Sequence, residues 1–137
     1  MGEAAPPLPP GPCRFIVNVS AMEGKFNRYK LPTHPHTNMA KAALNMMTRT
    51  SAQDYAQSGI FMTAVDTGWI NDENPLERAA KTAARHNFQT PIDEIDAAAR
   101  ILDPILGPLS IASAHEQGGL CQPLFGAFLK DYFMIEW

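Results

Sequence analysis

The sequence has little of several features that define common protein classes. Only two cysteines, Cys13 and Cys121, occur in 137 residues. They are too few and too isolated for a disulfide framework or a CxxC metal site, so we expect two free thiols. Eleven Lys and Arg against fourteen Asp and Glu give a net charge of −3, which argues against nucleic acid as a partner. No apolar run approaches the roughly 20 residues of a membrane span and no signal peptide precedes the domain, so we expect a cytoplasmic chain without a membrane partner.

Proline, by contrast, is concentrated at the start of the chain. Five of the twelve prolines fall within residues 1–12, a composition that favours extended, solvated backbone. We therefore predict a disordered Pro-rich arm over residues 1–13 and one domain over residues 14–137. The PxxP matches at Pro6 and Pro7 are compatible with an SH3-like partner, but such matches are common by chance.

A strand, a helix and a second strand follow the arm. The β-branched and aromatic run at 15–19 predicts a strand covered on both faces, which is typical of a parallel sheet. Residues 20–35 have no sustained period and are expected to form a loop. From Thr37 to Gln57 no Gly or Pro interrupts a helical pattern, which Gly59 ends before an apolar strand at 60–65. The predicted apolar stripe of this helix comprises Ala40, Ala43, Leu44, Met47 and Tyr55. Together these elements predict one βαβ crossover in an α/β fold.

The second half predicts two more helices and a strand. Asn74 and Pro75 begin a helix that should end near His86. Thr90 is the expected cap of the next helix, which Pro104 should stop or kink. Its predicted apolar stripe comprises Ile92, Ile95, Ala98, Ala99 and Leu102. Residues 107–123 read as a loop, followed by a strand at 125–129 and an aromatic tail containing Tyr132, Phe133 and Trp137.

Candidate functional residues lie where such folds bind ligands, at the carboxyl ends of parallel strands. They are Ser20, Ala21, Thr37, Lys41, Asp66, Thr67 and Gly68. Lys41 stands near the positive end of its helix dipole, which disfavours a cation slightly and suggests a specific role, although a solvated surface lysine is the plain alternative.

These segments resemble the C-terminal half of a short-chain dehydrogenase/reductase (SDR). The resemblance rests on the run 15–21, the segment 36–45, the strand 59–65 with Asp66-Thr-Gly-Trp after it, and Gly126-Ala-Phe-Leu-Lys-Asp-Tyr near the end. It covers nearly everything after Cys13. It implies a partial Rossmann-like doubly wound parallel sheet of about three strands with flanking helices. It also implies NAD or NADP as cofactor and a small-molecule carbonyl or alcohol as substrate.

The resemblance assigns roles to individual residues. In the family a Ser and a YxxxK pair support hydride transfer, because an ammonium lowers the pKa of the phenol until it exchanges a proton near neutral pH. Lys41 matches the lysine, where it would also orient the ribose, and Thr37 replaces the tyrosine. The serine position falls on Ala21, with Ser20 before it. Gly68 and Ile70 match the stretch that contacts the nicotinamide.

Two other residues are possible replacements for the missing proton donor. Tyr29 precedes the helix in the loop, and His36 adjoins Thr37. Ordinary roles as a loop aromatic and a helix-entry residue are the alternatives. An HxH metal pair of His34 and His36 lacks third and fourth ligands nearby in sequence.

The family's TGxxxGxG turn, which lets the backbone approach the pyrophosphate, has no counterpart here. We therefore expect an SDR-like oxidoreductase polypeptide without its dinucleotide-binding half, inactive or weakly active alone. We also expect its first strand to form an uncovered sheet edge. The alternative is a non-catalytic binding or scaffold protein that dimerises through the helix at 37–57.

Overall fold

The computed structural model describes residues 11–70, 92–114 and 123–137. The predicted helix at 74–86, the Thr90 cap, Cys121 and most of the Pro-rich arm lie outside these ranges. Cys13 is a free, exposed thiol. The described elements, in chain order, are β1 (Arg14–Ser20), a 3-10 turn η1 (Met22–Gly24), α1 (Pro35–Gln57), β2 (Ile60–Asp66), α3 (Glu94–Ala114), β3 (Phe128–Lys130) and β4 (Phe133–Ile135).

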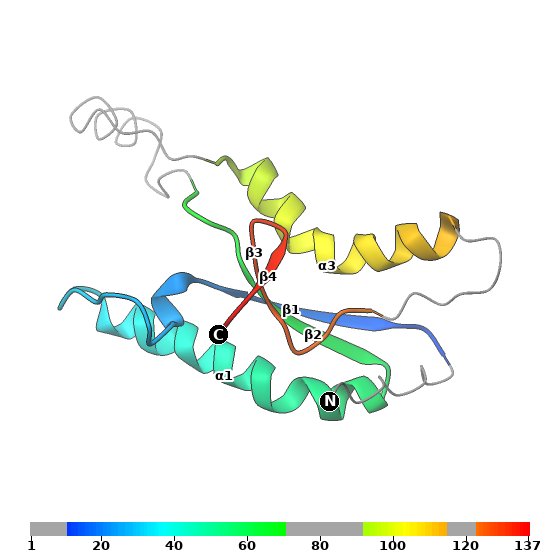
Figure 1. The fold of residues 1–137 in the computed structure, drawn as a ribbon, viewed down its shortest axis with the longest axis horizontal. Helices are drawn as coiled ribbons and strands as arrows, with labels where there is room; N and C mark the ends of the chain where they lie inside the picture. Colours follow the sequence, from blue (N-terminus) through cyan, green and yellow to red (C-terminus); the bar gives the residue numbers. More distant parts are fainter. Residues whose placement is uncertain (1–10, 71–91, 115–122) are drawn as a thin grey trace.

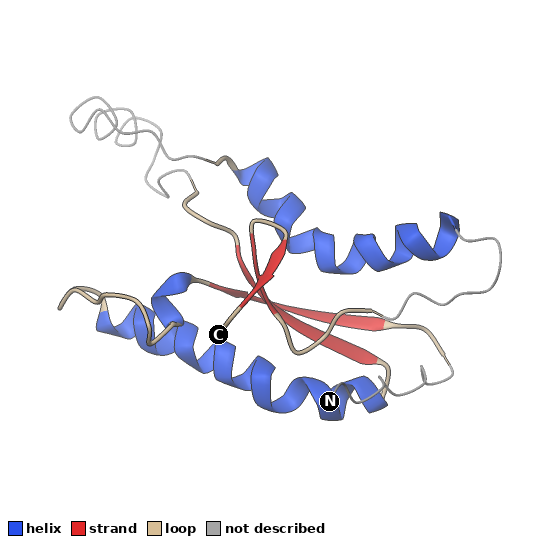
Figure 2. Cartoon of the chain, in the orientation of Figure 1, coloured by secondary structure: helices blue, strands red, loops and turns tan. Residues whose placement is uncertain are grey.

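The four strands form one sheet in the order β1-β2-β3-β4. β1, β2 and β3 run parallel, and β4 pairs antiparallel with β3. Helices α1 and α3 lie on opposite sides of the sheet (Figures 1 and 2). The predicted α/β fold and the β1-α1-β2 crossover are confirmed. The sheet has one strand more than the three expected.

Strand β2 is the centre of the core. Six of its seven residues are buried, whereas β1, at the edge of the described sheet, is buried only at Asn18 and Ser20. The Phe61 ring lies 6.0 Å from Phe15 and 6.2 Å from Phe125, centroid to centroid. Helices α1 and α3 both contact β1, as expected for a strand covered on both faces, although Val19 stays partly exposed. Among the described residues β1 also forms the expected uncovered edge of the sheet.

Helix α1 contacts the sheet through a different face from the one predicted. Its buried residues are Asn45, Thr48, Ala52 and Ala56. Small side chains let the helix approach the sheet closely, and the two polar ones are hydrogen-bonded to β1. The predicted stripe fails because it counts only apolar residues: Met47 and Tyr55 are exposed.

Local geometry explains the ends of α1. The helix begins at Pro35, two residues before the predicted Thr37, since proline is well tolerated in the first helical turn. Gly59 ends the helix as predicted. It has φ of +73°, and its N–H donates to the carbonyl of Ala56, a helix end that a residue without Cβ adopts readily.

Helix α3 departs from prediction in its start, its end and its face. Asp93 caps it, because its Oδ1 accepts the N–H groups of Ile95 and Asp96. The helix continues past Pro104 to Ala114, into the predicted loop, and bends partway along its length (Figure 1). The predicted inward stripe is wrong, since Ile95 is 73% exposed while Ala97 is buried.

The chain end forms a strand rather than a plain aromatic tail. Asp131 and Tyr132 have φ of +50° and +69°, the conformation that a tight antiparallel hairpin requires. The reversal between β3 and β4 brings Trp137 to 5.8 Å from the Phe128 ring, centroid to centroid. Among the described residues, no helix combines the length and apolar character that crossing a membrane requires.

Candidate functional site

The carboxyl ends of the three parallel strands form a row of polar residues. Ser20 pairs in register with Asp66, and Asp66 pairs with Lys130. Residues paired in register project from the same face of a sheet. The sheet edge predicted to carry chemistry therefore presents a hydroxyl, a carboxylate and an ammonium side by side.

Asp66 connects the segments around this edge. Its Oδ2 lies 2.9 Å from Lys130 Nζ and accepts the N–H of Met22 at 3.2 Å. Its Oδ1 accepts the N–H of Gly68 at 2.8 Å. The Asp66 side chain is nearly inaccessible, whereas Lys130 keeps about a third of its side chain in contact with solvent. Asp66 is thus a structural anchor, and Lys130 is the end of the pair that a ligand can reach.

Lys41 lies at the tip of β1. Its half-buried side chain extends from the second turn of α1 and donates a hydrogen bond from Nζ to the carbonyl of Val19 at 2.9 Å. Strand β1 and helix α1 are therefore joined at the site by a charge-assisted hydrogen bond, which is stronger than one between neutral groups. This hydrogen bond places the ammonium at the tip of β1, where its side chain stays partly exposed to solvent.

Ser20 is fully engaged by α1. Its Oγ lies 2.5 Å from Asn45 Oδ1 and 3.3 Å from the carbonyl oxygen of Lys41. Two residues earlier on the same face of β1, Asn18 donates from Nδ2 to Thr48 Oγ1 at 2.9 Å. The hydroxyl predicted as a catalytic group thus belongs to a polar seam between β1 and α1.

The structure brings Thr37 near Lys41 but does not supply a phenol there. Thr37 is half-buried and precedes Lys41 by four residues, so the two share a face of α1. Of the suggested replacements, Tyr29 is 90% exposed in the loop. The exposed His36 has its ring 6.0 Å from that of His34, and the described residues contain no cluster of three metal-ligating side chains.

The predicted cofactor-contacting stretch is engaged within the chain. Arg100 donates from Nη1 to the carbonyl of Thr67 at 3.0 Å and to Asp131 Oδ1 at 2.5 Å. The same nitrogen would lie 3.0 Å from a Cβ at Gly68, so the guanidinium covers this glycine. Ile70 forms a β-bridge with Ile92.

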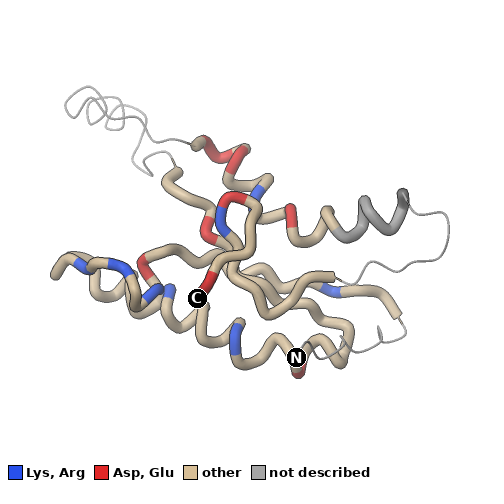
Figure 3. The backbone as a smooth tube through the Cα atoms, in the orientation of Figure 1, with Lys and Arg blue, Asp and Glu red and all other residues tan. Residues whose placement is uncertain are grey.

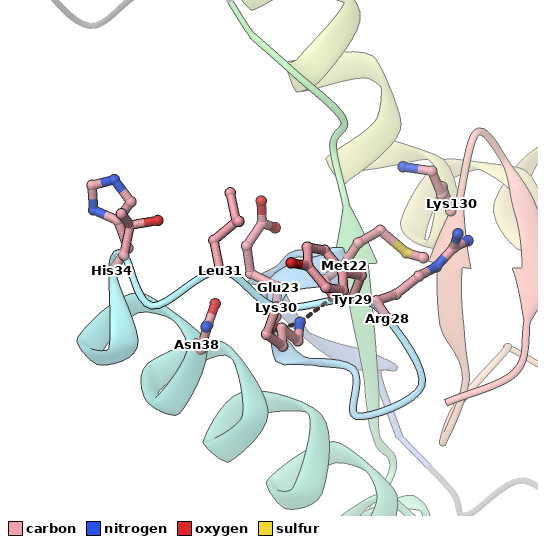
Figure 4. A pocket seen from close by; sticks show the side chains of 10 residues that line it. Met22, Glu23, Arg28, Tyr29, Lys30, Leu31, His34, Asn38 and Lys130 are labelled. Atoms are coloured by element: carbon pink, nitrogen blue, oxygen red, sulfur yellow. Dashed lines mark hydrogen bonds between the residues drawn. The ribbon is translucent and has the colours of Figure 1, made fainter.

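A depression of about 510 Å³ opens beside this edge (Figure 4). It is formed by η1, the loop that follows, the start of α1 and the end of β3. Its polar lining includes Glu23, Arg28, Tyr29, Lys30, His34, Asn38 and Lys130, and its apolar lining includes Met22 and Leu31. Lys30 folds the loop back by donating from Nζ to the carbonyl of Glu23 at 2.6 Å. The segment predicted as a featureless loop therefore forms one wall of a cavity.

Close packing between the backbones of η1 and α1 holds this loop in place. A Cβ on Gly24 would lie 2.5 Å from the carbonyl carbon of Lys41 and 2.7 Å from the nitrogen of Ala42. Only glycine allows η1 to lie flat against α1 here. Beyond it, Lys25 is buried, donates from Nζ to the carbonyl of Glu136, and lies 5.3 Å from the Phe128 ring centroid.

Sequence reasoning missed Arg28, Lys130, Lys25 and Arg100 as members of the site. Lys130 could have been found, because it follows a predicted strand just as Asp66 does. Arg28 and Lys25 give no periodic or motif signal. Their placement depends on the path of a loop that only its hydrogen bonds and Gly24 determine.

Comparison with known proteins identifies the fold. No family model matches the sequence. The chain is 37% identical over 107 residues to an uncharacterized protein, R665, of Acanthamoeba polyphaga mimivirus. That match covers 73% of this chain and 22% of the relative, so the chain spans about a fifth of the relative's length.

Among solved structures, the chain is similar to the NADPH-bound carbonyl reductase from chicken fatty liver. The TM-score is 0.56 at 22% identity, covering 90% of this chain and 40% of the reductase. The chain therefore has a Rossmann-like α/β fold of the type found in short-chain dehydrogenases/reductases and spans less than half of that reductase.

Proposed function

We propose that this chain is the substrate-side portion of an SDR-like oxidoreductase in which the proton relay has kept its ammonium and lost its phenol. On its own it does not catalyse hydride transfer. The observation that carries this proposal is the position of Lys41, whose Nζ is bonded to Val19 at the tip of β1, one helical turn after Thr37 and beside Ser20.

The hydrogen bonds around Lys41 favour structural roles for the residues that align with the family's proton relay. Ser20 Oγ is committed to Asn45, and the Lys41 ammonium is committed to a backbone carbonyl. The hydroxyl of Thr37 is an alcohol, which is far less acidic than a phenol and is a poor proton donor near neutral pH. A carbonyl or alcohol substrate at this point would receive hydrogen bonds without efficient proton transfer.

The described residues do not fit a nicotinamide cofactor in this chain alone. Gly68, which matches the family's nicotinamide-contacting stretch, is covered by Arg100, and its N–H is already donated to Asp66. The 137 residues contain no TGxxxGxG sequence of the kind that accepts a pyrophosphate at a helix N-terminus. We therefore derive no reaction step through NAD or NADP for the isolated chain.

Titration of the purified chain with NADH and NADPH, followed by nucleotide fluorescence, tests this proposal. We expect no saturation up to about millimolar nucleotide, weaker than the micromolar range typical of functional sites. An intact carbonyl reductase is the positive control. Saturable micromolar binding by this chain would contradict the proposal.

A second candidate function, a scaffold that dimerises through α1, is supported by exposed apolar side chains on this helix. Met39 and Met46 are 70% and 56% exposed, and Met47 and Tyr55 are also exposed. Met39 and Met46 are seven residues apart, so they share one side of α1, away from the buried residues Thr48 and Ala52. Methionine adapts readily to a partner surface, and a two-fold dimer would bring this side of α1 against its own copy.

Sedimentation velocity of the wild type and of Met46→Asp tests the scaffold. A dimer that becomes a monomer in the variant is the expected result. Phe26→Asp is the control, because Phe26 is an exposed apolar residue in the loop before α1 rather than on the helix. A wild type that stays monomeric at high micromolar concentration would exclude the scaffold.

A further inference from the structure

The lining of the depression carries more positive than negative charge. Three cationic side chains, Arg28, Lys30 and Lys130, face it with one carboxylate, that of Glu23. Basic positions also gather along the loop before α1, whereas acidic positions mark the start of α3 (Figure 3). An anion entering the depression would therefore meet a favourable local potential, although the whole chain is acidic.

Arg28 is the cation best placed to bind such an anion. Lys130 is paired with Asp66, and Lys30 donates to the backbone of η1. Within the described part of the chain, the guanidinium of Arg28 makes no ion pair or hydrogen bond. The repulsion between Arg28 and the buried Lys25 contributes to the lowered pKa of Lys25. The positive charge of Arg28 is thus not neutralised by an ion pair with a described acidic residue.

The arrangement is also amphipathic. Arg28 and Lys130 lie toward one end of the depression in Figure 4, Leu31 lies toward the other, and Met22 and Glu23 lie between them. A volume of about 510 Å³ lies within the range of roughly 300–1,000 Å³ that small-molecule sites occupy. A planar guanidinium matches a carboxylate through two parallel hydrogen bonds.

From this arrangement we infer that the depression binds a small carboxylate with an apolar body. The carboxylate lies against Arg28, with Lys130 beside it, and the hydrocarbon portion lies on Met22 and Leu31. This inference goes beyond the proposed function and does not depend on it, because binding requires neither a nucleotide nor proton transfer.

Calorimetric titration of the 137-residue chain with hexanoate at low ionic strength tests the site. We expect saturable binding that weakens about tenfold in Arg28→Gln, as loss of a charge-assisted pair implies. Arg49→Gln is the matched control, since Arg49 is an exposed arginine on α1, and its affinity should equal that of the wild type. Hexanamide, which has the same body without the charge, should not saturate.

Two further titrations distinguish an amphipathic carboxylate from other anionic ligands. Leu31→Ala should weaken hexanoate binding and leave that of acetate unchanged, because only hexanoate reaches the apolar end. Inorganic phosphate should displace hexanoate poorly. The inference is overturned if hexanoate does not saturate the wild type, if both arginine variants bind it equally, or if phosphate displaces it at lower concentration than hexanoate itself needs.

Discussion

Lys130 Nζ and Asp66 Oδ2 lie 2.9 Å apart across two register-paired strand ends. The same carboxylate holds the N–H groups of Met22 and Gly68, so one buried side chain joins η1, β2 and β3. This arrangement makes Asp66 the structural centre of the candidate site.

Replacing Asp66 by Asn should therefore destabilise the chain. The variant loses the charge that Lys130 faces and at least one backbone acceptor, and leaving buried groups unpaired costs about 1–3 kcal/mol. Urea unfolding measures this change. Asp131→Asn is the control, because its pair with Arg100 is more exposed and should contribute less than about 1 kcal/mol. Equal losses in the two variants would contradict the central role of Asp66.

Gly24→Ala should lower stability far more than Gly107→Ala. A Cβ at Gly24 meets the backbone of α1, which cannot move aside cheaply, so we expect a loss of about 1–3 kcal/mol. A Cβ at Gly107, within α3, meets nothing within 4 Å apart from its chain neighbours, but Pro108 follows it and disfavours a helical alanine there, so the change should stay within about 0.5 kcal/mol. Thermal unfolding of both variants checks this, and a stable Gly24→Ala would show that η1 does not need its close approach to α1.

The variant Thr37→Tyr tests directly whether Thr37 occupies the position of the family's catalytic tyrosine. A phenol introduced one turn before Lys41 should have its pKa lowered by roughly one unit from its usual value near 10, because the ammonium stabilises the phenolate. Ultraviolet difference titration against the parent chain isolates the new phenol from the three natural tyrosines. The double variant Thr37→Tyr/Lys41→Met should restore the ordinary pKa. A phenol that titrates alike in both variants would place Thr37 outside the influence of Lys41.

Lys25 should make stability depend on pH in the alkaline range. Burial lowers its pKa below the ordinary 10.5, and the charge of Arg28 lowers it further. The unfolded chain then binds this proton more tightly than the folded chain, so the free energy of unfolding rises with pH between the lowered pKa and 10.5. Urea midpoints across this range should rise less in Lys25→Met than in the wild type. Lys30→Met, at an exposed lysine, serves as the control and should keep the wild-type slope.

Composition and strand patterns predicted the architecture better than the faces of its helices. The apolar run of β2 and the helix-ending Gly59 marked the crossover, because burial on both faces and a positive φ leave clear sequence signals. The inward face of α1 did not, because Asn45 and Thr48 enter the core through hydrogen bonds to β1. Hydrophobic periodicity cannot detect a polar seam.

Some residues of the candidate site could likewise be located from the sequence, and others could not. Lys41 and Ser20 could be located from strand ends and spacing, and both lie at the tip of β1. Arg28 and Lys25 could not, because their positions depend on contacts between a loop and the distant end of the chain. The link from Lys25 to Glu136 joins residues 111 positions apart, which no local pattern encodes.

That link gives the final residues of the chain a role beyond closing a hairpin. Glu136 supplies the acceptor for a buried ammonium, and Trp137 shields the Phe128 ring beneath it. Loss of these two contacts should loosen the packing of Lys25 and of Phe128 beside the loop that walls the depression. Glu136 thus ties the segment after β4 to the loop that walls the depression.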